Sequence, residues 1–317
     1  MKPRTAAHIP SKLGAPTGRG VLDRPAGVAT QIRWRYALPI LALHLLALLA
    51  LVPWLFSWSG FALLVAGVPV FGAGINVGYH RLLAHGAFKC PAWVERTFVF
   101  LAVCCLEDAP ATWVATHRLH HKDSDARPDP HSPLASLWWS HMGWLLREND
   151  EVSSLNVYDR YARDLLKQPF YRWLQRGNIV MWIYVAHAAV YFAAGFLASW
   201  LSGGSRSESL QLASSWLAWG VALRTVVVWH ITWSVNSLSH VFGYQSYRTG
   251  DESRNNWLVA LLANGEGWHN NHHIDPTSAS NWHRWWELDV TYLVIKSLAA
   301  VGLATDVVPI RRGHRVG

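Results

Sequence analysis

Cysteine is scarce in this chain, whose 317 residues include only Cys90, Cys104 and Cys105. Their spacing provides neither a disulfide framework nor a Cys-x-x-Cys metal site, so we expect reduced thiols in a reducing compartment. Charged residues are also few, at 15%, whereas soluble domains carry about 25%. Together with 51% hydrophobic residues and 20 tryptophans, this shortage indicates a membrane protein, because Trp concentrates at the lipid–water boundary.

Several catalytic motifs are missing as well. The sequence contains no G-x-S-x-G, no Walker loop and no G-x-G-x-x-G in the right context, which argues against hydrolases of the nucleophile-elbow type, P-loop NTPases and dinucleotide-binding enzymes. Acidic residues are outnumbered, and the net charge is +8. Beside long apolar segments, this charge favours an anionic membrane surface or an acidic protein partner, and we expect no nucleic acid.

Four apolar segments are long enough to cross a bilayer, which takes about 20 residues. They cover residues 36–56, 60–79, 178–201 and 210–236. Short links join the first to the second and the third to the fourth, which predicts two hairpins. Because Lys and Arg gather away from the hairpin tips, both termini should be cytoplasmic. The prediction is an all-α, multi-pass integral membrane protein with a cytoplasmic helical cap formed by residues 80–177 and 237–317.

The segments outside the spans carry further expectations. Residues 1–33 are basic and proline-rich without the apolar core of a signal peptide, so they are predicted to be a flexible tail, and residues 34–317 to form a single domain. The apolar runs at 97–106 and 137–146 are too short to span and should lie at the interface. Arg224 falls inside the fourth span, where charge is costly; a structural ion pair and a substrate contact both remain open.

Histidine is the residue present in unusual number, with 17 copies. Nine of them cluster at the ends of the predicted spans: His80, His85, His117, His120, His121, His240, His269, His272 and His273. Two clusters read H-x-x-H-H, whose three histidines share one face of a helix. Asn236 and His240 also share a face. His80 and His85 are five residues apart and do not, so we expect the chain to unwind between them at the end of the second span.

Imidazole is a ligand for iron, copper, zinc and nickel. Nine rings exceed the six positions of one octahedral ion, so they predict a site for two ions with an open position. Carboxylates should orient the rings, and the candidates are Glu107, Asp108, Asp123, Asp125, Asp129 and Glu266. The other eight histidines, His131 included, are expected to be ordinary. A membrane metal transporter is an alternative, but it would place its ligands within the spans.

Residues 34–310 resemble the membrane fatty-acyl desaturases of the stearoyl or Δ9 type. The resemblance rests on three histidine boxes in order, within "GYHRLLAHGAFKC", "WVATHRLHHKDSDARPDPHSP" and "NNWLVALLANGEGWHNNHH", and on "VNSLSHVFGY". It implies that the nine histidines hold two irons, with Asn236 contributing through a water. Zinc is expected as a purification artefact. Ala115 stands where animal acyl-CoA members tend to carry a basic residue, so an acyl-lipid substrate competes with acyl-CoA.

The same resemblance implies an oxygen-dependent reaction that leaves a cis double bond, most simply at Δ9, in a saturated acyl chain. Two electrons would come from a separate cytochrome b5-type protein or ferredoxin. Leu64, Val68 and Trp113 are expected to contact the substrate, the first two at the closed end of its tunnel. A histidine-box hydroxylase is the alternative enzyme. The active site should face the cytoplasm, at the inner membrane of a bacterium or the endoplasmic reticulum of a eukaryote.

Overall fold

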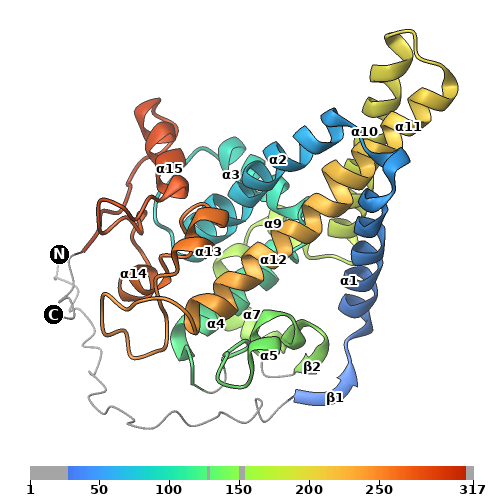
Figure 1. The fold of residues 1–317 in the computed structure, drawn as a ribbon. Helices are drawn as coiled ribbons and strands as arrows, with labels where there is room; N and C mark the ends of the chain where they lie inside the picture. Colours follow the sequence, from blue (N-terminus) through green and yellow to red (C-terminus); the bar gives the residue numbers. More distant parts are fainter. Residues whose placement is uncertain (1–27, 127–128, 150–153, 312–317) are drawn as a thin grey trace.

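Four helices long and apolar enough to cross a membrane run through the computed structural model, which describes residues 28–126, 129–149 and 154–311 (Figure 1). They are Trp34–Leu51, Trp58–Ala84, Ile179–Leu201 and Arg206–His240. The predicted all-α fold with four spans is therefore confirmed. The second and fourth spans continue beyond the predicted ends, so that helical turns carry on into the histidine clusters.

The first two spans are each built from more than one helical segment. They comprise α1 (Trp34–Ala47), η1 (Leu48–Leu51), η2 (Pro53–Leu55), α2 (Trp58–Ala73) and η3 (Gly74–Ala84). The first span ends earlier than the predicted residue 56, because Val52 is extended before Pro53 and a residue that precedes proline is disfavoured in the α region. The second begins cleanly, because the Ser57 side chain accepts a hydrogen bond from the Gly60 N–H.

The third span is one helix and the fourth is a composite. Their segments are α10 (Ile179–Leu201), α11 (Arg206–Leu217), η5 (Ala218–Leu223), α12 (Arg224–Ser237) and η6 (Leu238–His240). Ser205 and Glu208 form a reciprocal capping box at the start of α11. α10 packs along α11, whereas α1 and α2 both pack against η5 and α12. The fourth span is therefore the central helix of the membrane part.

Arg224 is completely buried in this central helix. Its guanidinium donates to the carbonyl oxygens of Gly220 and Cys104 and lies 3.9 Å from the ring centroid of Phe71. No carboxylate pairs with it among the described residues, so the expected structural ion pair is wrong. Backbone carbonyls and an aromatic face take its place, and the charge fixes the fourth span to the end of α3.

The cap surrounds one end of the bundle. Its elements are α3 (Ala92–Val103), α4 (Pro110–Asp123), α5 (Leu137–His141), η4 (Gly143–Leu145), α7 (Leu155–Tyr161), α8 (Arg163–Leu166), α9 (Pro169–Leu174), α13 (Trp257–Leu262), α14 (His269–Ile274) and α15 (Val290–Ala300). The short antiparallel strands β1 (Val28–Ile32) and β2 (Arg147–Asn149) pair beside α5 (Figure 1). β1 lies at the end of the predicted tail, whose first 27 residues are outside the described part, so the tail as a whole stays a prediction.

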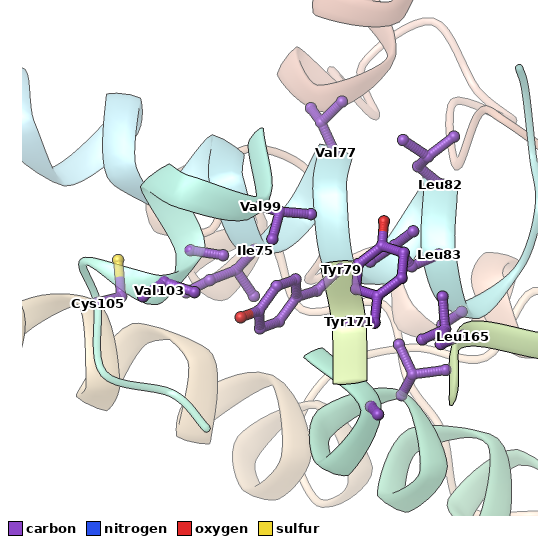
Figure 2. Close-up of a cluster of buried hydrophobic side chains, with 14 of the residues drawn as sticks. Ile75, Val77, Tyr79, Leu82, Leu83, Val99, Val103, Cys105, Leu165 and Tyr171 are labelled. Carbon is purple, nitrogen blue, oxygen red and sulfur yellow. The ribbon is translucent and has the colours of Figure 1, made fainter. Parts of the chain in front are cut away.

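A buried apolar cluster holds the second span against the cap (Figure 2). Ile75 and Val77 of η3 are nearly or fully buried, as are Val99 and Val103 of α3. Gly78 permits this approach, since a Cβ there would lie 2.9 Å from the Phe98 Cβ. The packing fixes the position of η3, and the first histidines follow directly from it.

Candidate metal centre

The first histidine pair lies on a π-helix. In η3 hydrogen bonds join residues five apart, and the His85 N–H donates to the His80 carbonyl at 3.2 Å. The two side chains therefore lie above one another, with ring centroids 4.8 Å apart. The expected unwinding is wrong: the helix widens instead, and this places both rings on one face.

The other two boxes form helical turns of α4 and α14, as their spacing predicts. All nine histidines converge in two groups whose potential ligand nitrogens lie within 4.8 Å of one another. One group is His80, His85, His117, His121 and His272, and the other is His120, His240, His269 and His273. Each H-x-x-H-H box is split between the groups, so the two groups are immediate neighbours.

Four of the rings are held by a carboxylate at Nδ1. The pairs are His80–Glu266 at 3.0 Å, His120–Asp129 at 2.9 Å, His240–Asp125 at 2.8 Å and His273–Asp251 at 2.7 Å. Three of these acids were among the candidates, whereas in the described part of the chain Glu107, Asp108 and Asp123 form no ion pair with any of the nine histidines. Asp251 was missed, because it lies 22 residues before His273 in a loop with no ligand-like spacing.

The pKa values match a cation site built from neutral rings. Burial, reinforced by neighbouring imidazoles, lowers the pKa of His85, His117 and His272 well below 6.5. Burial alone would raise the pKa of Asp251, but the charge of His273 and their hydrogen bond hold it below its usual range. The exception among the rings is His240, for which burial would lower the pKa but the charge of Asp125 and their hydrogen bond raise it. Several of the rings are therefore neutral nitrogen ligands, and ionised carboxylates hold others, which is the arrangement that orients metal-bound histidines.

The Nε2 atoms make these residues suitable metal ligands. The Nδ1 atoms of His120 and His240 face carboxylates, and their buried Nε2 atoms have no hydrogen-bond partner, so that each ring, when neutral, presents Nε2 as an acceptor. The Nε2 atoms of His80 and His272 lie 3.0 Å apart. Nitrogen ligands bound at about 2.1 Å around one ion are spaced by roughly this much. With no thiolate in either group, the donor set suits the ions that imidazole binds, which are iron, copper, zinc and nickel.

A cavity of about 200 Å³ adjoins the first histidine group. His117, Trp113 and Asn236 line it, and the Trp113 ring stacks on His117 with centroids 4.9 Å apart. Leu64 and Val68 are not among its lining residues, so their place at the closed end of a tunnel stays a prediction. His131, which was expected to be ordinary, also lines the cavity and lies 4.3 Å from the His120 ring.

Glu107 gives the cavity wall a neutral polar group. Burial raises its pKa to about 8, and hydrogen bonds to Thr232 and Trp113 only partly offset this. The carboxyl is therefore protonated at neutral pH and does not bring a charge beside an apolar ligand. All three side chains line the cavity, and further lining residues come from α1, α4, η4, α9, α10 and α12 and from the loops beside them.

We predict that Asp251→Asn weakens metal binding by about 10- to 100-fold, because the amide cannot carry the charge that faces His273 Nδ1. Metal content and affinity in the purified protein measure this. Glu252→Gln is the matched control, since the neighbouring Glu252 carboxylate is half-exposed and its ion pair among the described residues is with Arg254. Equal affinities in the two variants would contradict the role given to Asp251.

Known proteins are similar to this chain in sequence. A fatty acid desaturase profile matches residues 53–301. The sn-1 stearoyl-lipid 9-desaturase of Anabaena variabilis is 40% identical over 87% of this chain and 94% of its own length. A chloroplastic palmitoyl-monogalactosyldiacylglycerol delta-7 desaturase of Arabidopsis thaliana is 43% identical over 84% and 67%, and an acyl-CoA 5-desaturase of Anemone leveillei is 42% identical over 84% and 76%. The chain therefore belongs to the fatty acid desaturase family and is a fatty-acyl desaturase.

Proposed function

We propose that this desaturase uses two iron ions and dioxygen to form a cis double bond at the Δ9 position of a saturated acyl chain. The observation that carries the proposal is one cavity that adjoins the first of two neighbouring histidine groups. The Δ9 position is supported by the names of relatives in Anabaena variabilis and Nostoc, both 9-desaturases. Asn236, which lines the cavity, is the residue proposed to contribute through a water.

Iron with dioxygen would supply the power to remove hydrogen from an unactivated methylene, which acid–base side chains lack. The protein's own part is to hold and orient the chain. Trp113, Trp229 and Trp233 form apolar walls of the cavity, while Glu107, which is protonated at neutral pH, adds no charge of its own to the wall. Glu266, Asp125, Asp129 and Asp251 fix four rings so that their Nε2 lone pairs face inward.

The electron donor in this proposal is a separate cytochrome b5-type protein or ferredoxin, as the family resemblance implies. The net charge of +8 suits an acidic donor. The distribution of Lys and Arg supports cytoplasmic termini and a cytoplasmic active site. The acyl carrier is either CoA or a membrane lipid at this stage, because the names of the relatives include both.

Lipid analysis of a host that expresses the chain tests the proposed reaction. We expect new cis-monounsaturated chains with the double bond at carbon 9, located by mass spectrometry of derivatised fatty acids. Hydroxylated chains would support the hydroxylase alternative, and unchanged lipids from a metal-loaded, membrane-inserted protein would contradict both enzymes. The host that expresses His272→Ala provides the matched background.

Metal exchange tests the cofactor. Imidazole sites bind zinc at least as tightly as ferrous iron, so overproduced protein is expected to carry zinc and to be inactive. Removal by a chelator followed by ferrous reconstitution should restore activity in proportion to iron content, with the metals measured by elemental analysis. Full activity in zinc-loaded, iron-free protein would contradict the proposed cofactor.

A further inference from the structure

α13 is apolar on all sides, although one of its faces lies on the surface of the protein. Its sequence is WLVALL, and Val259 is buried. The opposite face consists of exposed side chains, which are Trp257, Leu258, Leu261 and Leu262. Trp257 and Leu261 are exposed by 68% and 69%. Because a helix that is hydrophobic all round belongs in an apolar environment, the outer face of α13 needs an apolar partner.

The carboxyl end of α13 is fixed to the second span, beside the fourth (Figure 1). Asn264 Nδ2 donates to the Pro69 carbonyl at 3.3 Å, and Asn76 Nδ2 donates to the Ala263 carbonyl at 3.0 Å. The second span begins at Trp58, and Pro69 and Asn76 follow this residue by roughly 17 and 27 Å at the rise of an α-helix. Since the hydrocarbon core of a bilayer is about 30 Å thick, the end of α13 lies at a level within it.

The chain returns from this depth directly along α13. The Asn256 N–H donates to the Gly267 carbonyl at 2.8 Å, so the two ends of the segment meet. A Cβ on Gly267 would collide with the amide nitrogen of Ala260, and glycine therefore allows the return segment to touch the helix. Residues 265–268 are all buried, as irregular backbone at membrane depth must be. The exposed side of the segment is the outer face of α13.

We infer that residues 256–268 form a re-entrant loop, in which α13 dips into the bilayer leaflet on the side of the cap and its outer face contacts lipid acyl chains. No Lys, Arg, Asp or Glu occurs between residues 255 and 265, so the loop carries no charge into the hydrocarbon. The adjoining second span is apolar on its surface too, with Val65 and Val70 exposed by 56% and 51%. The third histidine box follows the loop directly, so lipid contact also holds this box in place.

Site-specific photo-crosslinking tests the lipid contact. p-Benzoyl-phenylalanine is introduced at Leu261 of the full chain, which is reconstituted in dioleoyl-phosphatidylcholine vesicles, irradiated and examined by intact-mass spectrometry. We expect protein–lipid adducts at a yield similar to that from Val65 of the second span, and none above the unirradiated background from Glu252. Glu252 is a half-exposed control beyond the end of the fourth span, where its N–H donates to Asp125.

Two results would overturn the inference. Adducts between two protein chains at Leu261, in place of lipid adducts, would show that a second copy covers the outer face of α13. A lipid yield at Leu261 no higher than at Glu252 would show that the face lies in water. Because crosslinking needs neither metal nor turnover, both results are independent of the proposed reaction.

Hydrogen exchange measures the link between the loop and the third histidine box, which begins at His269. Leu261→Glu places a charge on the outer face of α13, which is costly in lipid, whereas Leu261→Ala keeps the face apolar and is the matched control. In the same vesicles, we expect amide protection across residues 265–273 to fall roughly tenfold or more in the Glu variant alone. Equal protection in the two variants would overturn the anchoring of the box by lipid.

Discussion

His272→Ala is expected to abolish desaturation while the protein stays in the membrane. His272 is fully buried, and its Nε2 lies 3.0 Å from that of His80 and 2.9 Å from that of His121. No other side chain of the third histidine box lies between His80 and His121 in this way. Removal of the His272 ring therefore leaves a gap at the centre of the first histidine group. Product analysis by gas chromatography, with metal content measured on the same sample, checks the prediction.

His44→Gln is the control for this variant. His44 is a half-buried histidine of the first span that belongs to neither histidine group, so its replacement should preserve both metal content and product formation. A His272→Ala protein that retains two metals and substantial activity would show that His272 is not a ligand. A protein that loses activity but also leaves the membrane would point to a folding role instead, which membrane fractionation would reveal.

Arg81→Met is expected to lower the free energy of unfolding by about 3–5 kcal/mol, because it leaves two buried carboxylates without their counter-ion. Arg81 is completely buried, and its guanidinium lies 3.0 Å from Glu266 and 3.3 Å from Asp289. It also donates to the Ala279 carbonyl at 2.8 Å. Denaturant titration in mixed micelles measures the effect.

Arg163→Met is the matched control for stability. Arg163 pairs with Asp159 at 3.6 Å, but both side chains are about 70% exposed, and such surface pairs contribute about 0–1 kcal/mol. If Arg81→Met and Arg163→Met lower the free energy of unfolding equally, the buried ion pair does not stabilise the fold. Because Glu266 also holds His80, a loss of metal affinity in Arg81→Met alone would show that the pair supports the site as well as the fold.

The ligands were predictable because their signal is local. Three residues at i, i+3 and i+4 share a face on any α-helix. The spacing of His117, His120 and His121 was therefore enough to predict that their side chains lie on one face. Asp251 had no such signal, since only the folded chain brings its loop to His273. The surroundings of Arg224 could not be predicted from the sequence either. Its partners include backbone carbonyls such as that of Cys104, and every residue type has one.

The widened helix at His80 and His85 makes this part of the protein sensitive to the number of residues as well as to their identity. On an ordinary α-helix each residue adds about 100° of rotation, so a deletion between the two rings would turn everything after it out of register. A one-residue deletion that also converted η3 to α-helix would place the two histidines four residues apart on an α-helix, so that their rings would again share one face. Laboratory evolution of this segment should therefore accept paired length and helix-type changes and reject isolated ones.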